Sequence, residues 1–440
     1  MRRERKKDQE WFNELHSNDK VIEVIGTRLL RMSGPLKIEC FENCFANLEK
    51  IILRKLHLTN LEIINCSRLR NITLSELSSL ESLSVCDCPE LTELTELKFD
   101  NLIELKCSNT SIKKLSFKFC PNIMKLDCSN NDKLVNLDVS NCPKLEFLDC
   151  SHNKLTILDL SNCELLFKEY EKKSSNFNYP YGLKIIRRKN LVIVGRTASG
   201  KSTLSNVLAD TQEFEGSERS YSVAKSFLKK YFEWEGKFYC VIDTTGVGCT
   251  KLSTKNVLDK ILDGIYSMPG GISQVLFVID ERFTAEEAKL FNLLKDSIFE
   301  IGILEYTTIV KTKFSNFKDK NKCDADKEQL HNENEKIAEI VRSCRDVVYV
   351  NNPPINIDII DDDDRITVEN NKKIRQRSRE ILLSYLNVAC QERYFKLKSW
   401  DELHKKIAKC TENENLSKVV ESNQELETFT KISQEFCTFI

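Results

Sequence analysis

The residues of this sequence most able to do chemistry lie between Gly195 and Ser202. They read Gly-Arg-Thr-Ala-Ser-Gly-Lys-Ser, which follows an apolar run at 190–194 and precedes a helical pattern at 203–208. In that context, backbone N–H groups and a helix N-terminus surround phosphate groups. Lys201 would neutralise the β and γ phosphates, and the Ser202 hydroxyl would ligate Mg²⁺. We therefore predict a nucleoside triphosphate held by Gly195, Arg196, Thr197, Ala198, Ser199, Gly200, Lys201, Ser202 and Thr203.

A second candidate group is Asp243-Thr-Thr-Gly246, which follows the apolar run 238–242. An acid at the C-terminal end of a strand in the same parallel sheet would face the metal site. We predict that Asp243 holds Mg²⁺ through water and that the Gly246 amide senses the γ-phosphate. An Asp that only caps a helix is the alternative. The predicted metal ligands are Ser202 and Asp243.

The elements that position these residues alternate along the chain. Further apolar runs at 275–279, 307–310 and 347–350 each follow a helical stretch, and an amphipathic pattern at 374–386 closes the series. Such alternation predicts an α/β fold, a doubly wound P-loop domain. We place this domain at 189–388, followed by a helical tail at 389–440 that packs on the domain or on a partner.

The stretch from 191 to about 352 resembles the GTPases of the immunity-associated-protein family, related to the plant avirulence-induced-gene type. Besides the loop and Asp-Thr-Thr-Gly, it shares Pro269-Gly-Gly-Ile, Arg282-Phe-Thr-Ala-Glu-Glu287 and Tyr349-Val-Asn-Asn352. The resemblance implies GTP/GDP and Mg²⁺ as ligands, and a nucleotide-dependent homodimer formed through the G domain. It also implies base contacts from Thr312, Lys313, Asn351 and Asn352.

Three residues depart from the family pattern, and a fourth differs from Ras-like enzymes. Ala198 replaces a third loop glycine, and Ala224 replaces a switch threonine that would ligate Mg²⁺, for which Ser222 could substitute. Ser315 stands where an aspartate would read guanine. Val247 stands where Ras-like enzymes keep a water-orienting glutamine, which the resembled family also lacks. These changes predict slow hydrolysis and weakened guanine selectivity, and we assign no catalytic residue.

The first half of the chain is a repeat. From about 56 to 166, apolar-x-apolar-x-x-Asn/Cys returns every 10 or 11 residues, with cysteine at the polar position as Cys66, Cys88, Cys120, Cys142 and Cys163. This resembles the leucine-rich repeat, with two steps in a coil of about 21 residues. We predict a helical cap at 1–20, a leucine-rich-repeat solenoid at 21–167 and a linker at 168–188. A solenoid implies a protein partner.

The chain has 18 cysteines, which could also signal zinc or disulfides. It contains no Cys-x-x-Cys pair, and no secretory signal opens it. We therefore predict that the repeat cysteines are buried, reduced packing residues. Similarly, Asp361 to Asp364 could bind metal but more simply begin a helix or lie in a solvated loop.

The 440 residues have a net charge of −1 and 41% hydrophobic content. This balance predicts a cytoplasmic protein with no nucleic-acid partner, and no run reaches the roughly 18 apolar residues of a transmembrane helix. Two functions remain open. One is a GTP-dependent switch or slow GTPase whose repeats recruit a partner. The other is a non-catalytic scaffold in which the G domain is static or dimerising. A third possibility, a Roc-type repeat protein, fits less well because the tail is short.

Overall fold

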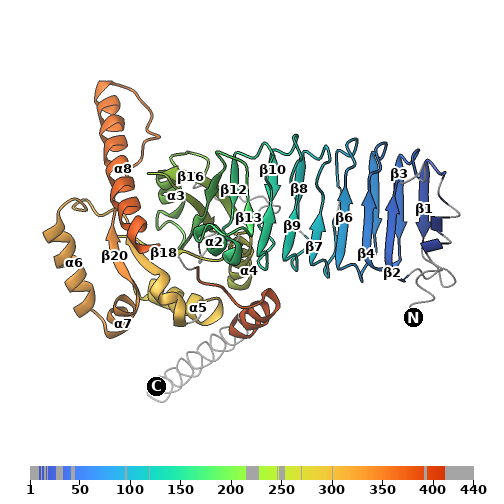
Figure 1. The fold of residues 1–440 in the computed structure, drawn as a ribbon. Coiled ribbons are helices and arrows are strands. Elements are labelled where there is room, and N and C mark those ends of the chain that lie inside the picture. Colours follow the sequence, from blue (N-terminus) through green and yellow to red (C-terminus); the bar gives the residue numbers. More distant parts are fainter. Residues whose placement is uncertain are drawn as a thin grey trace, which may run out of the picture. The chain divides into compact units, whose positions relative to one another are not determined.

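The computed structural model of the protein describes residues 9–10, 12–13, 16, 18–25, 33–40, 45–94, 97–117, 119–214, 227–244, 246, 253–268, 270–299, 301–390 and 394–411. The chain divides into two compact units, Met1–Arg187 and Arg188–Ile440 (Figure 1). Each has its own hydrophobic core.

The first unit is built from short parallel strands. They are β1 (Val21–Ile25), β2 (Ser33–Glu39), β3 (Lys50–Arg54), β4 (His57–Ile64), β5 (Asn71–Ser75), β6 (Ser82–Cys86), β7 (Glu104–Lys106), β8 (Lys114–Ser116), β9 (Lys125–Asp127), β10 (Asn136–Asp138), β11 (Phe147–Asp149), β12 (Ile157–Asp159), β13 (Phe177–Asn178) and β14 (Lys184–Ile186). Seven of them form one sheet in the order β13-β11-β9-β7-β6-β4-β2. The others form sheets of three, two and two strands, so the predicted leucine-rich-repeat solenoid over 21–167 is not confirmed.

The repeated leucines nevertheless determine the register of the seven-stranded sheet. Leu61, Leu83, Leu105, Leu126 and Leu148 are direct neighbours across five consecutive strands. All five are fully buried, because residues alternate between the two faces of a strand and the leucine face is inward. A one-residue slip would turn the whole column to solvent, so the pattern specifies the pairing.

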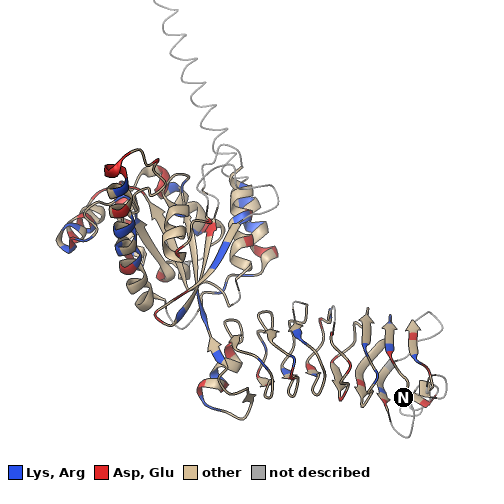
Figure 2. Ribbon diagram, turned by 90° about the horizontal axis from the view of Figure 1, so that it is seen from above, with Lys and Arg blue, Asp and Glu red and all other residues tan. Residues whose placement is uncertain are grey.

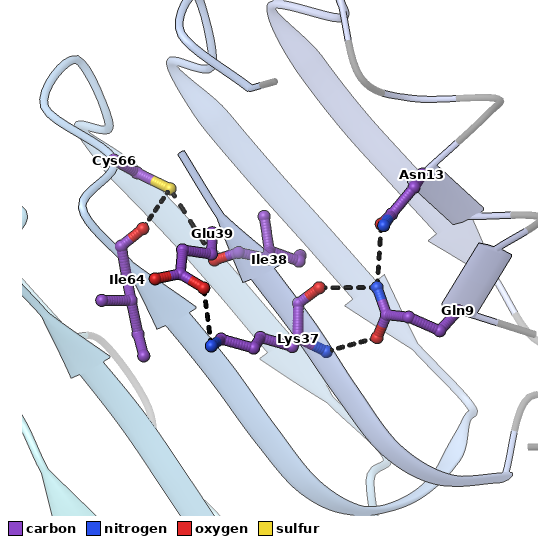
Figure 3. Close-up of polar contacts among 7 residues, drawn as sticks. All are labelled: Gln9, Asn13, Lys37, Ile38, Glu39, Ile64 and Cys66. Atoms are coloured by element: carbon purple, nitrogen blue, oxygen red, sulfur yellow. Dashed lines mark hydrogen bonds and ion pairs between the residues drawn. The ribbon is translucent and has the colours of Figure 1, made fainter. Parts of the chain in front are cut away.

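A side chain closes the end of this sheet. The Gln9 amide donates to the carbonyl of Lys37 at 2.7 Å and accepts from its backbone N–H at 2.7 Å (Figure 3). Lys37 lies on β2, the terminal strand, so Gln9 pairs with backbone groups as a neighbouring strand would. Phe12 packs into the core from the same segment. Residues 1–8 of the predicted cap at 1–20 lie outside the described residues.

Residues 168–187 of the stretch 168–188, predicted as a linker, belong to the first unit, and Arg188 begins β15 of the second. Helix α2 (Glu164–Glu171) runs into this stretch, and β13 and β14 pair with β11 and β12. The charged and polar composition of the stretch suggested a linker. Buried Phe177, Leu183 and Ile186 instead anchor it to the first unit.

The second unit is a six-stranded sheet in the order β16-β17-β15-β18-β19-β20. Its strands are β15 (Arg188–Gly195), β16 (Phe227–Trp234), β17 (Lys237–Thr244), β18 (Gln274–Ile279), β19 (Thr307–Lys311) and β20 (Asp346–Tyr349). Only β16 is antiparallel, and it was not predicted from the sequence. The five predicted strands are present, and they pair in parallel as a P-loop α/β fold requires.

Helices cover both faces of this sheet (Figure 1). They are α3 (Lys201–Ala209), α4 (Thr254–Tyr266), α5 (Ala285–Ser297), η1 (Ile301–Tyr306), α6 (Lys320–Asn332), α7 (Glu335–Ser343) and α8 (Asp362–Ala389). Side chains of α4, α5 and α7 share one core, and those of α3 and α8 share the other. The acidic run at 361–364 begins α8, where Asp361 and Asp364 form a capping box.

The described part of the predicted tail packs on the second unit. Phe395 bridges to Ile272 in antiparallel fashion, and Leu403 and Ile407 are fully buried in the core that α4 and α5 share. Residues 412–440 lie outside the described residues. Among the described helices, none combines the length and apolar character that crossing a membrane requires.

Candidate functional site

The loop after β15 has the backbone geometry of a phosphate cradle. A Cβ added to Gly195 would lie 2.5 Å from the carbonyl oxygen of Val278, so the close packing of β15 against β18 at this point requires glycine. Gly200 has φ +92° and is the N-cap of α3, which starts at Lys201. Ala198 also has a positive φ, +66°, which costs a non-glycine residue roughly 1–2 kcal/mol. This is the position where the resembled family has glycine.

Lys201 is buried at the first turn of α3. Only 6% of it is exposed, and its Nζ donates to the carbonyl oxygen of Arg196 at 2.5 Å. Burial lowers the pKa of Lys201 to about 8, although the Asp243 carboxylate opposes this shift. The ammonium group of Lys201 bonds its own loop in this structure. When phosphate oxygens occupy the loop, the same group can bind them in place of the Arg196 carbonyl.

Ser202 and Asp243, from α3 and the end of β17, meet at the same place. The Ser202 hydroxyl donates to Asp243 Oδ2 at 2.7 Å, and the carboxylate is fully buried. Thr244 donates to the Ile193 carbonyl at 2.7 Å, which ties the strand end to β15. A hydroxyl and a carboxylate are both oxygen donors suited to Mg²⁺. The two groups therefore fit the metal that the sequence predicts.

Gly246 lies against the loop. A Cβ there would be 2.7 Å from both Lys201 Nζ and the Thr197 amide nitrogen. The Thr197 hydroxyl also donates to the Gly246 carbonyl at 3.3 Å. Ser222, Ala224, Thr245, Val247 and Pro269 lie outside the described residues.

The predicted base-contacting residues approach the loop from β19. The Thr312 hydroxyl is placed to donate to the backbone carbonyls of Ser199 and Ile279, at 2.9 and 3.1 Å. Lys313 has φ +58° and pairs through Nζ with Asp280 Oδ2 at 2.5 Å. Ser315 is exposed at the start of the turn that follows.

The second predicted base-side group follows β20. The backbone N–H of Asn351 donates to Ser378 Oγ at 3.0 Å, and the Ser378 hydroxyl donates to the backbone carbonyl of Asn351 at 2.6 Å. Asn352 differs. Both polar atoms of its side chain are buried and have no hydrogen-bond partner among the described residues. An unsatisfied buried amide is costly in a native fold, and a ligand that pairs with it would remove that cost.

Sequence reasoning missed one wall of the site. A cavity of about 490 Å³ beside the loop is lined by Arg196, Ser199, Asp280, Arg282, Glu287 and Lys313. Asp280 follows β18 directly, so the signal that pointed to Asp243, an acid at the C-terminal end of a buried strand, was also available here. Thr203, the last predicted loop contact, lies in the first turn of α3.

Comparison with known proteins assigns this region. Residues 189–356 match the AIG1 family. The chain is 31% identical over 127 residues to immune-associated nucleotide-binding protein 10 of Arabidopsis thaliana, covering 28% of this chain and 27% of that protein. It is also 31% identical over 127 residues to immune-associated nucleotide-binding protein 1 of the same plant, covering 28% of this chain and 56% of that protein. The chain thus spans less than two thirds of either relative.

Among solved structures, Toc33 from Arabidopsis thaliana in complex with Mg²⁺ and GMPPNP is similar at 17% identity and a TM-score of 0.31, covering 52% of this chain and 91% of that one. The family match, the loop geometry and the parallel sheet agree on the class of domain. The second unit contains a P-loop GTPase domain of the AIG1 type, in residues 189–356.

Proposed function

We propose that this chain binds GTP and GDP with Mg²⁺ and acts as a nucleotide-dependent switch or slow GTPase in the cytoplasm. The observation that carries the proposal is the arrangement of Lys201, Ser202 and Asp243 around one glycine-rich loop. A buried ammonium, a hydroxyl and a buried carboxylate at a helix N-terminus serve a phosphate-bearing anion and its metal.

In this proposal each group has one task. Backbone amides from Gly195 to Thr203 cradle the phosphates, and Lys201 offsets their charge. Ser202 ligates Mg²⁺, and Asp243 holds it through water. The Gly246 amide faces the γ-phosphate. Bound Mg²⁺ would neutralise charge on the β and γ phosphates.

The base would lie between the β19 and β20 loops. Asn352 would pair with it, and Lys313 would pack along its face. The unsatisfied Asn352 amide supports this placement, because guanine offers both donors and acceptors. Ser315 offers a neutral hydroxyl in place of a carboxylate, so guanine preference should be weaker than in an ordinary GTPase.

We assign no catalytic residue, and hydrolysis would be slow or would depend on a second copy of the chain. The solved relatives include chloroplast translocon components for which dimerisation is important for GTPase activity. A homodimer through the G domain is therefore part of the proposal. The repeats of the first unit, of leucine-rich type, would bind a protein partner.

A second candidate is a non-catalytic scaffold that binds nucleotide without turning it over. The left-handed Ala198 favours it, because this backbone strain lies in the phosphate loop itself. Single-turnover phosphate release separates the two candidates. Measurable release of phosphate from bound GTP supports the switch, and its absence at all protein concentrations supports the scaffold.

The test of nucleotide binding is a titration of the full chain with GTP, GDP and ATP in the presence of Mg²⁺. Lys201→Ala should weaken GTP binding by roughly tenfold to a hundredfold, since a charge-assisted hydrogen bond contributes about 1.5–3 kcal/mol. Lys289→Ala, an exposed lysine on α5, is the matched control and should bind like the wild type. Equal GTP affinity for Lys201→Ala and wild type would refute the site.

A further inference from the structure

A second cavity of the same unit lies at the other end of α3. Its volume is about 790 Å³, and its lining includes Val207, Asp210, Ile355, Lys372, Arg375 and Arg379. Helix α3 begins at Lys201, and its residue Val207 lines the cavity, so at 1.5 Å per residue the cavity is on the order of 9 Å from the phosphate loop. Helices α3 and α8 contact each other along this region (Figure 1). The cavity is distinct from the candidate nucleotide site.

Two half-buried arginines project into this cavity from one face of α8. Arg375 and Arg379 are four residues apart, which places their side chains one above the other. Each anchors one nitrogen to a backbone carbonyl: Arg375 Nε donates to Pro353 at 2.6 Å, and Arg379 Nε donates to Leu208 at 3.1 Å. Within the described part of the chain, their terminal nitrogens have no partner. Each guanidinium is thus oriented, with most of its five N–H donors still available.

Charge in the cavity is not balanced. Three cations, Lys372, Arg375 and Arg379, line it together with one acid, Asp210. Lys372 pairs with Glu369 at 2.9 Å, but the two arginines form no ion pair with a described residue. Burial without a counter-charge lowers the pKa of Arg375 from its usual value.

The neighbouring Arg377 shows the ordinary arrangement on this helix. It is 57% exposed and pairs with Glu380 at 3.1 Å. Acidic and basic residues are interspersed over the helices of the second unit (Figure 2), so an excess of cations in one concave site is unusual there. Burying unpaired charge is unfavourable, and an anion that enters the cavity would relieve that cost.

We propose that this cavity binds a small phosphorylated molecule, with Arg375 and Arg379 donating to its phosphate group. Two guanidinium forks can share the several oxygens of one phosphate, whereas a single carboxylate is matched by one fork. The volume is within the range of small-molecule sites. Val207 and Ile355 supply apolar walls for the rest of the ligand, and Asp210 can accept a hydrogen bond from a hydroxyl group.

The test uses pyrophosphate as the probe, titrated by calorimetry into the full chain carrying Lys201→Ala, so that the phosphate loop contributes little. Saturable binding should persist in this background. Adding Arg375→Gln and Arg379→Gln together should weaken it at least tenfold. Adding Arg377→Gln instead should change it less than twofold. No saturable binding in the Lys201→Ala chain, or the same loss with Arg377→Gln, overturns the proposal.

Two further experiments cover the case of a misfolded variant and separate a small-molecule ligand from a lipid headgroup. If the double variant does not fold, judged by its thermal transition, Arg379→Lys keeps the charge and removes the fork. It should weaken pyrophosphate binding several-fold, and unchanged affinity counts against the site. A soluble inositol phosphate is compared with vesicles that carry the same headgroup on a lipid. Binding to the free headgroup supports a small-molecule site, and binding to vesicles alone overturns it.

Discussion

Asn131 in the first unit and Asn352 in the second differ in how their buried side-chain polar atoms are paired. In the first unit, Asn131 is fully buried, and both of its side-chain atoms are satisfied. Its Oδ1 accepts from the amide and hydroxyl of Thr110 at 2.8 and 2.5 Å. Its Nδ2 donates to the carbonyls of Cys107 and Cys128 at 2.8 and 2.9 Å. In the second unit, neither side-chain atom of Asn352 has a described partner.

The difference separates folding from binding. Asn131 bonds backbone groups that the turn between strands would leave unpaired, so its polarity stabilises the fold. Asn352 carries a desolvation cost of about 1–3 kcal/mol that nothing in the described fold offsets. Lys201 is similar, since among the described residues its buried ammonium has one hydrogen-bond partner, the Arg196 carbonyl. Because Asn352 and Lys201 both belong to the predicted nucleotide-binding motifs, we infer that a bound nucleotide supplies the partners that they lack in the described fold.

The largest expected effect concerns the thiols of the first unit. Cys66, Cys88, Cys120, Cys142 and Cys163 are fully buried and free of disulfides. Burial raises the pKa of Cys142 to about 12, which leaves about a thousandfold less thiolate than an ordinary thiol has. We expect alkylation of Cys142 to be at least that much slower than in the denatured chain, and burial should also slow alkylation of the other four. Half-buried Cys323 and Cys410 are internal controls and should label faster than these five. Rapid native labelling of the five, read by mass spectrometry, would contradict the repeat register.

The next effect compares the two asparagines directly. Asn131→Ala removes the partner of the Thr110 amide and of the Cys107 carbonyl, whereas the Cys128 carbonyl keeps its bond from Asn153, and it should lower the stability of the first unit by roughly 2–4 kcal/mol. Asn352→Ala removes an unsatisfied amide, so the second unit should be equally or more stable. GTP affinity should fall by about fivefold, the equivalent of one hydrogen bond.

Hydrogen exchange of peptides from β7 and β9 measures the stability of the first unit in each variant. The fluorescence of Trp234 and Trp400 reads the second. If Asn352→Ala destabilises its unit as much as Asn131→Ala does, then Asn352 is structural, and the contrast between the units fails.

The sequence predicted these regions to different depths for physical reasons. Each of the five core strands of the second unit is an apolar run bounded by a functional motif, so local pattern was sufficient. Strand β16 has no fully buried residue and pairs only with β17 at the sheet edge, so it lacks the continuous apolar run that marked the other strands, and it was missed. In the first unit, the leucine period predicted the register, but not the division into separate sheets. The polar stretch at 168–188 owes its strands to pairing with β11 and β12, which composition does not reveal.

The third prediction concerns the base. Ser315→Asp should raise GTP affinity by about tenfold to a hundredfold, because a carboxylate would accept two charge-assisted bonds from guanine. ATP affinity should stay nearly unchanged. Asn316→Asp, one position along the same turn, is a matched control that adds the same charge. A gain of equal size in Asn316→Asp, or no gain in Ser315→Asp, would show that Ser315 does not face the base.

The smallest expected effect is the uptake of less than one proton by Lys201 when GTP binds. Without nucleotide, burial holds the pKa of Lys201 near 8, below the 10.5 of a free lysine. The charged form is therefore penalised below pH 8, and this destabilisation is relieved as pH rises from 8 toward 10.5. The contribution of Lys201 to the free energy of unfolding of the nucleotide-free second unit should therefore increase between pH 8 and pH 10.5. Phosphate oxygens reverse the shift, because opposite charge favours the ammonium.

Binding of GTP near pH 8 should thus take up about half a proton, rising toward one at pH 9 and falling toward zero below pH 7. Calorimetry in two buffers of different ionisation enthalpy measures this uptake directly. Lys201→Arg is the control, since a guanidinium stays charged and should take up none. Equal binding enthalpies in the two buffers at pH 8 would mean that Lys201 is already protonated before nucleotide arrives. The buried lysine would then be compensated within the fold, as Asn131 is, and the contrast between the units would rest on Asn352 alone.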